Sequence, residues 1–67
     1  MRTFSCYIHD DRYAAPSLVF YLAETEDEAR DMVRRDLLDN PHHRSVEVCE
    51  ADTLLFVETR EIADQTS

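Results

Sequence analysis

The 67-residue chain contains no glycine and no tryptophan, and all seven of its basic residues are arginine. Phosphate-cradling loops and the dinucleotide-binding turn need glycine where the backbone approaches the ligand closely. Neither site can be built here in its usual form. Turns must rely instead on Asp, Asn, Ser and Pro, which tolerate tight geometry for other reasons.

Positive charge is also scarce, because the seven arginines stand against 15 acidic residues and leave a net charge of −8. Nucleic acids and anionic membranes repel so acidic a chain, and we expect neither as a partner. The simplest meaning of the acidity is solubility. Two more specific explanations of the acidity are a basic protein partner and mimicry of a nucleic-acid backbone.

Long apolar runs and cysteine frameworks are missing as well. No segment approaches the roughly 20 apolar residues that span a bilayer, and Met1 leads into alternating residues rather than into a secretory leader. Cys6 and Cys49 form neither a CxxC motif nor a disulfide framework, which favours two reduced thiols in a cytoplasmic protein. A core of this size contributes only about 3–5 kcal/mol. Because no disulfide or metal staple is visible, we expect a homodimer.

What the chain does contain is one complete helix, predicted over residues 26–39. Thr25 can accept hydrogen bonds from the free N–H groups of the first turn, and Glu28 can complete a capping box. Asn40 suits the position after the helix, and Pro41 cannot continue it. Helical spacing predicts a stripe that faces the core, made of Ala29, Met32, Val33 and Leu37.

The segments on both sides of the helix alternate in the manner of strands. Strands are predicted over 3–9, 17–23, 45–50 and 54–58. The inward side chains are expected to be Phe4, Cys6, Ile8, Val46 and Val48.

The second predicted strand is apolar on both of its faces, which indicates that its outer face is covered too. We assign Tyr7, Val19 and Tyr21, together with Cys49, to the face of the sheet away from the helix. We expect the dimer contact there, because a partly apolar open face favours docking against another copy.

The order of the elements along the chain limits the possible strand orders of the sheet. The helix returns the chain across the sheet, so the third strand can lie beside the first with every pair antiparallel. The prediction is an α+β fold of the ββαββ type, an antiparallel sheet of order 2-1-3-4 with one helix packed on one face. The chain is expected to be a single small domain over residues 1–67, ordered over about 3–58, with a frayed C-terminal tail.

The densest polar cluster runs from His9 to Tyr13, at the end of the first predicted strand. One interpretation is an acid–base or metal site. The other is a solvated hairpin loop, in which Arg12 pairs with an aspartate and Tyr13 packs back on the sheet. The predicted topology brings the helix-ending pair His42 and His43 to the same end, where it could serve a metal or simply suit the helix dipole. The possible functional edge is His9, Asp11, Arg12, Tyr13 and His43, with no catalytic residue, metal ligand or cofactor assigned.

Three segments carry a resemblance: His9–Leu18 (HDDRYAAPSL), Asn40–His43 and Val46–Val48. They resemble a group of short, uncharacterised bacterial proteins that share an HDDRYxxPSL-like segment. The resemblance covers about residues 3–58 and implies a stand-alone small domain; the group has no assigned activity, so it implies no catalytic residue. At the level of fold alone, the arrangement is loosely similar to small antitoxin domains of the HicB type, without that family's glycine- and proline-rich signature.

These observations predict a small acidic cytoplasmic protein that is not an enzyme, namely a homodimeric protein-interaction module. Two alternatives stay open. One is an acidic inhibitor, antitoxin-like or mimicking nucleic acid, which binds a basic protein. The other is a small metal-dependent site at the edge that carries His9 and His43.

Overall fold

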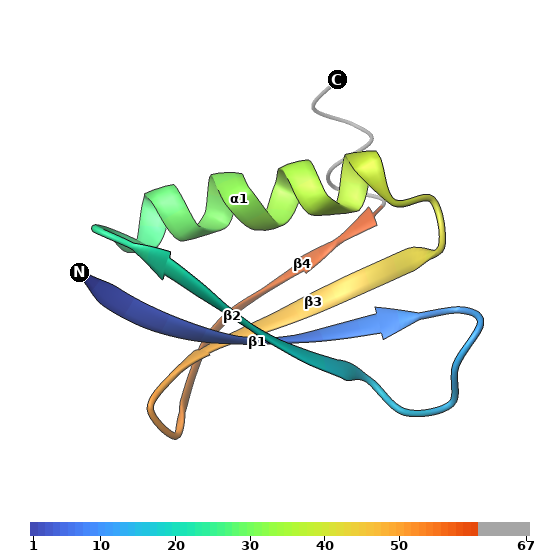
Figure 1. The fold of residues 1–67 in the computed structure, drawn as a ribbon, viewed down its shortest axis with the longest axis horizontal. Helices are drawn as coiled ribbons and strands as arrows, with labels where there is room; N and C mark the ends of the chain where they lie inside the picture. The colour runs from blue at the N-terminus through green and yellow to red at the C-terminus, as the bar shows by residue number, and fades with distance from the viewer. Residues whose placement is uncertain (61–67) are drawn as a thin grey trace.

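In a computed structural model the chain folds into a four-stranded antiparallel sheet with one helix on one side (Figure 1). The structure describes residues 1–60. The elements are β1 (Arg2–Asp10), β2 (Ser17–Ala23), α1 (Glu26–Asp39), β3 (His43–Glu50) and β4 (Thr53–Thr59). The strand order is β2-β1-β3-β4, which confirms the predicted α+β fold and its topology. Among the described residues, no helix has the length and hydrophobicity needed to cross a membrane.

Helix α1 begins and ends where the sequence signals lie. The Thr25 side chain accepts a hydrogen bond from the backbone N–H of Glu28 at 3.1 Å. At the other end, the backbone N–H and the side-chain amide of Asn40 both donate to the carbonyl oxygen of Asp36. These bonds satisfy groups that a helix end otherwise leaves to water.

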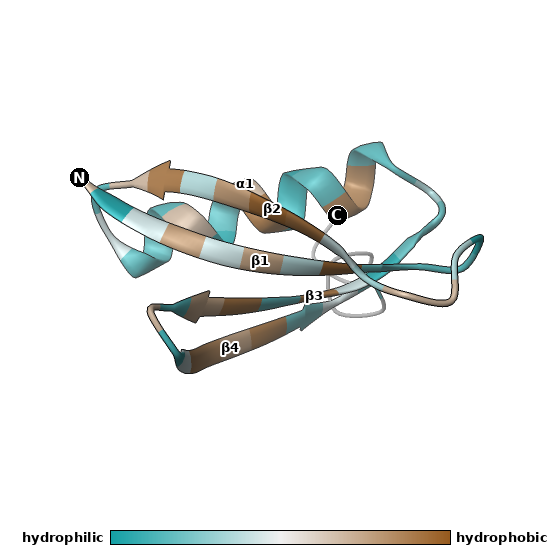
Figure 2. Cartoon of the chain, turned by 60° about the horizontal axis from the view of Figure 1, so that its bottom comes forward, coloured by the Kyte–Doolittle hydropathy of each residue, from teal (hydrophilic) through white to brown (hydrophobic). Residues whose placement is uncertain are grey.

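The core lies between α1 and the sheet. Phe4 and Cys6 of β1 and Val46 and Val48 of β3 have no exposed surface, and Ile8 is 4% exposed, as predicted. Figure 2 shows the alternation of hydrophobic and hydrophilic residues along β1 and β3 that produces this arrangement. The helix contributes the fully buried Ala29, Val33 and Leu37, with the partly buried Met32 packed beside them.

The register of β2 overturns one prediction about the faces of the sheet. Val19 lies opposite Cys6, and Tyr21 lies opposite Phe4. Residues directly opposite each other share a face, so Val19 and Tyr21 belong to the helix side and pack against the core. Their assignment to the face away from the helix was wrong, whereas Tyr7 does lie there. That face, called the open face below, receives Leu18, Phe20 and Leu22 from β2 instead.

A buried carboxylate attaches the helix to β4. Glu58 pairs with Val46 and therefore lies on the helix side, where its side chain is only 5% exposed. The Nε atoms of Arg30 and Arg34 lie 3.3 and 3.4 Å from its carboxylate oxygens. The guanidinium of Arg30 also lies over the Phe56 ring, 4.4 Å from its centre. Two turns of α1 are thereby held over β4 by ion pairs and a cation–π contact.

The first residues of the predicted frayed tail lie in the described part of the chain. Arg60 is described, and its guanidinium donates to the backbone carbonyls of Leu37, Asn40 and His43. It therefore supplies positive charge to the carbonyl end of α1, whose own last turn has no basic residue. The rest of the predicted tail, residues 61–67, lies outside the described part of the chain.

Candidate functional site

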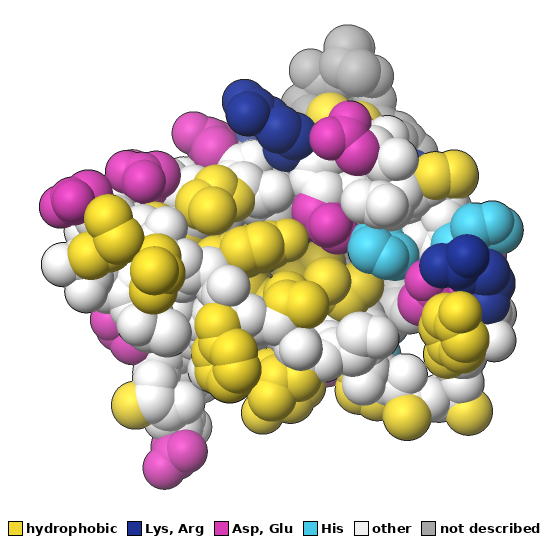
Figure 3. Space-filling view, viewed as in Figure 1, with side chains coloured by type: hydrophobic (Ala, Val, Ile, Leu, Met, Phe, Trp, Pro, Cys, Tyr) yellow, Lys and Arg dark blue, Asp and Glu magenta, His cyan; other side chains and the backbone are white. Residues whose placement is uncertain are grey.

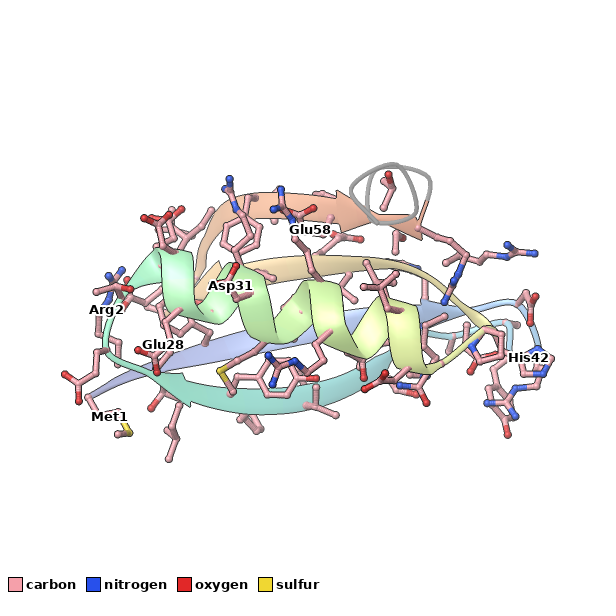
Figure 4. All side chains as sticks on the ribbon, turned by 90° about the horizontal axis from the view of Figure 1, so that it is seen from above. Met1, Arg2, Glu28, Asp31, His42 and Glu58 are labelled. Atoms are coloured by element: carbon pink, nitrogen blue, oxygen red, sulfur yellow. The ribbon has the colours of Figure 1, made fainter. Side chains whose placement is uncertain are left out.

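Two loops meet at one end of the sheet, as the topology predicted. They are the β1–β2 connection and the α1–β3 connection. The backbone N–H of Asp11 donates to the carbonyl oxygen of His42 at 2.9 Å, and Asp10 is the strand partner of His43. Figure 4 shows His42 at this end, opposite the end that carries Met1 and Arg2.

Asp10 is the centre of the first cluster at this end. It is 8% exposed, and its carboxylate accepts three hydrogen bonds from Arg12: from the backbone N–H, from Nε and from Nη2 at 2.8–3.0 Å. The paired guanidinium holds the pKa of Asp10 well below its ordinary value of 3.8 and raises that of Arg12. Of the loop interpretation, this confirms the pairing of Arg12 with an aspartate. A carboxylate held so firmly in its charged form is poorly suited to act as a general acid or base near neutral pH.

His43 joins this cluster to the helix. Its Nδ1 lies 2.7 Å from Asp36 of α1, its Nε2 lies 3.6 Å from Asp10 of β1, and its side chain is 17% exposed. Asp36 also accepts a hydrogen bond from the Asn40 side chain. Burial, followed by the charge of Asp36, raises the pKa of Tyr21 to about 12, so this phenol stays protonated. The imidazole of His43 thus bridges the carboxylates of Asp36 and Asp10, and it ties the last turns of α1 to the end of β1.

A second, more exposed cluster surrounds Asp11. Its carboxylate lies 3.0 Å from His42 Nδ1 and 3.3 Å from Arg44 Nη2. Tyr13 does not pack back on the sheet as predicted, because its side chain is 62% exposed and stacks against the guanidinium of Arg12 at 5.3 Å. These contacts hold the two loops together at the surface.

His9 does not join the other residues of the predicted edge. Its Nε2 lies 2.6 Å from a Glu47 oxygen, on the open face, whereas His43 lies on the helix side. The sheet itself separates the two imidazoles. No group of three or more His, Cys, Asp or Glu side chains that could hold a metal ion occurs in residues 1–60. The structure therefore brings together Asp10, Asp11, Arg12, His42 and His43, and places His9 apart.

The open face of the sheet is a second candidate site, and most of its residues were not identified from the sequence. It carries six large apolar side chains that are between 38 and 62% exposed, contributed by three of the four strands. They are Tyr7, Leu18, Phe20, Leu22, Leu54 and Val57. Across the sheet, Ser5, Glu47 and Cys49 of the central strands lie between the apolar residues of β2 and those of β4. Large exposed apolar side chains gathered on one face of a monomer mark a candidate interaction surface.

Charge is almost absent from the open face. The only carboxylate that the strands place there is Glu47, which is opposite Tyr7 and Val57 and is paired with His9. Arg2 and Glu50, which form an ion pair at 2.6 Å, follow the alternation of the helix side. The acidic residues Glu26, Asp27 and Glu28 lie in the first turn of α1. Apart from Glu47, these described carboxylates thus lie away from the apolar side chains of the open face.

Comparisons of the chain with protein-family models, with curated proteins and with solved structures gave no match. The resemblance to short bacterial proteins therefore stays a prediction, and the site must be judged by its own geometry.

Proposed function

We propose that this protein is a non-enzymatic interaction module whose open face packs against the open face of a second copy. The observation that supports this most is the apolar patch opposite α1. A helix covers one face of the sheet, and within residues 1–60 nothing covers the other. Burying apolar surface is the main driving force for association, and here it would involve residues that the monomer leaves in water.

The size of the face supports a second copy as the occupant. Strands of seven to nine residues, at about 3.3 Å per residue and about 4.8 Å between neighbours, make a face of about 25 by 20 Å. Two such faces together bury about 1,000 Å², the lower limit of a specific protein interface. A twofold contact between identical faces needs only one self-complementary patch, and an apolar patch with one internally paired carboxylate is self-complementary.

Charge favours the same occupant. Two chains of net charge −8 repel each other unless their acidic surfaces point apart. Packing the open faces together turns both α1 helices, with their acidic first turns, toward opposite sides of the dimer. A basic partner would instead be drawn to the helix side, away from the apolar patch.

The polar end supports a non-enzymatic role. Its carboxylates, imidazoles and guanidiniums contact one another across the two loops and α1. Such a network stabilises the loops and gives them one geometry. The proposal that the protein is cytoplasmic accords with the two free thiols of Cys6 and Cys49.

A matched pair of variants tests the dimer. Leu54 lies on the open face and is 54% exposed, and Leu38 lies on α1 and is 48% exposed. Both substitutions, Leu54→Lys and Leu38→Lys, change the net charge equally, so they differ only in where the lysine lies. We expect Leu54→Lys to weaken dimerisation at least tenfold and Leu38→Lys to leave it unchanged, read by sedimentation velocity. Equal effects of the two variants would contradict the proposal.

The cysteines locate the contact in the unaltered protein. Cys49 lies on the open face between Ser5 and Leu54, whereas Cys6 is fully buried and burial raises the pKa of its thiol to about 11. Alkylation of Cys49 should slow as the protein concentration rises, while Cys6 reacts slowly throughout. If Cys49 reacts at the same rate in dimer and monomer, the dimer uses another surface.

A further inference from the structure

The edge strand β2 carries none of the features that normally prevent a strand from pairing with another chain. From Ser17 to Ala23 it has no charged residue and no proline, and its seven consecutive pairs with β1 contain no bulge. Natural sheets usually protect an edge with charge, proline, a bulge or a covering segment. Within residues 1–60, β1 is the only strand that pairs with β2.

The opposite edge, β4, is protected. Its pairing with β3 shifts register between Val48 and Cys49. Its charged Glu58 points inward and binds two arginines of α1. An inward-pointing charge and a bulge are both means of blocking an edge. One sheet thus has one edge that is blocked and one that is free to pair.

The sequence of β2 is nearly symmetrical about its midpoint, Phe20. In an antiparallel pair of two β2 strands centred there, Leu18 lies opposite Leu22, and Val19 lies opposite Tyr21. Both sets are apolar or aromatic cross-strand pairs, which stabilise antiparallel sheets. The Leu and Phe pairs fall on the open face, and the Val–Tyr pairs fall on the helix side.

We propose that β2 pairs antiparallel with β2 of a second copy, about a twofold axis at Phe20, and so joins two sheets into one of eight strands. Figure 3, in which β2 is the strand nearest the viewer (Figure 4), shows hydrophobic side chains gathered over the middle and lower part of this side, with an acidic and a histidine side chain beside them. A second copy with the same uncharged strand meets no like charge along this edge. A basic peptide would find no carboxylate in β2 to recognise.

The edge contact also enlarges the open face. Joining two sheets along β2 makes one apolar layer of about 40 by 25 Å, so that two layers packed together bury about 2,000 Å². This area is typical of a stable assembly rather than a marginal one. The edge contact is distinct from the face-to-face contact proposed above, and its test reads the edge alone.

Disulfide trapping tests the axis directly. In a Cys49→Ser background, Phe20→Cys and Leu22→Cys place a thiol on the same strand, on the same face and at similar exposure of 62 and 56% in the parent. Directly opposite residues in an antiparallel pair have Cα atoms about 4.5–5.5 Å apart, within the range of about 4.4–6.8 Å that a disulfide spans. Two copies of Leu22 would instead be about 13 Å apart along the strands. Facing sheets are about 10 Å apart, which is also too far.

We expect Phe20→Cys to form a disulfide-linked dimer in a mild glutathione buffer with at least tenfold higher yield than Leu22→Cys. An equimolar mixture of Leu18→Cys and Leu22→Cys proteins should form the mixed disulfide in preference to either symmetric one. Both exposed substitutions leave the core intact, which far-ultraviolet circular dichroism checks. Equal yields from Phe20→Cys and Leu22→Cys, or no disulfide from Phe20→Cys, would overturn the proposal whatever the result for the face contact.

Discussion

Phe4 and Phe20 lie on neighbouring strands and on opposite faces of the same sheet. Phe4 lies under α1 with no exposed surface, while Phe20 is 62% exposed. The covered face accounts for the stability of the single chain. The open face has large apolar side chains that the single chain does not bury, and this is the observation on which the proposed association rests. The comparison separates the residues that form the core from the residues through which we propose that the protein associates.

Alanine at each phenylalanine gives the largest expected contrast. Phe4→Ala should cost about 3–5 kcal/mol of unfolding free energy, because it removes a large buried side chain and leaves a cavity. That is comparable to the whole stability of a core this size, about 3–5 kcal/mol, so the variant should be unfolded by circular dichroism at 25 °C. Phe20→Ala should stay folded and weaken self-association. Loss of folded structure in Phe20→Ala, with Phe4→Ala unaffected, would reverse the roles of the two faces.

Removing the charge of Glu58 should have the next largest effect on the covered face. Glu58→Gln leaves Arg30 and Arg34 beside each other without a carboxylate. The expected loss is about 1–2 kcal/mol, below the roughly 3–5 kcal/mol of a fully buried pair, because both arginines are partly exposed and water screens them. Urea denaturation measures the loss, with exposed Glu28→Gln as the control. An equal, negligible effect of both variants would show that the ion pairs do not hold α1 over β4.

A change in the β3–β4 turn alters stability without touching either face. Ala51 has φ = 54°, in the left-handed region that costs an ordinary residue about 1–2 kcal/mol. Glycine relieves this strain but loses about 0.4–1 kcal/mol through the freedom of the unfolded chain. Ala51→Gly should therefore stabilise the fold by about 0.5–1 kcal/mol in urea and leave the dimer dissociation constant unchanged. A parallel change in both quantities would mean that fold stability, not the open face, controls association.

Acid should weaken the ion pairs at both ends of the sheet. At the polar end Arg12 lowers the pKa of Asp10 from its ordinary 3.8, and at the opposite end Arg2 lowers that of Glu50 from its ordinary 4.5. A group with a lowered pKa contributes stability above its ordinary pKa and loses it as the pH falls toward the folded-state value. Unfolding free energy should thus decline as the pH drops below 4.5, the ordinary pKa of Glu50, and less steeply below 3.8 in Asp10→Asn. Urea midpoints from pH 6 down to pH 2 measure this, and identical slopes for the two proteins would refute it.

Much of the fold could be predicted because local signals agreed with one another. Thr25 and Asn40 marked both ends of α1, and β1 and β3 alternated with one apolar face each. Only one antiparallel arrangement then fitted the order of the elements. The polar end was also foreseeable in part, since the topology brought Asp10 and Asp11 to His42 and His43.

The face of β2 could not be read in the same way. Its two stripes, Leu18–Phe20–Leu22 and Val19–Tyr21–Ala23, are both apolar, and a shift of one residue exchanges them. A usable signal was the small Ala23, which suits close approach to the start of α1 and is fully buried. The long-range partners Asp36, Glu47 and Arg60 had no local signal at all, because each contact depends on tertiary structure.

Sedimentation equilibrium of the unaltered chain, from about 1 to about 200 µM at moderate salt, tests the central claim most directly. We expect the average mass to rise with concentration from that of one 7.9 kDa chain to at least twice that value. Added salt should favour association, because it screens the repulsion between two acidic chains. A mass that stays at 7.9 kDa across the whole range, at low and high salt, would contradict self-association through the open face.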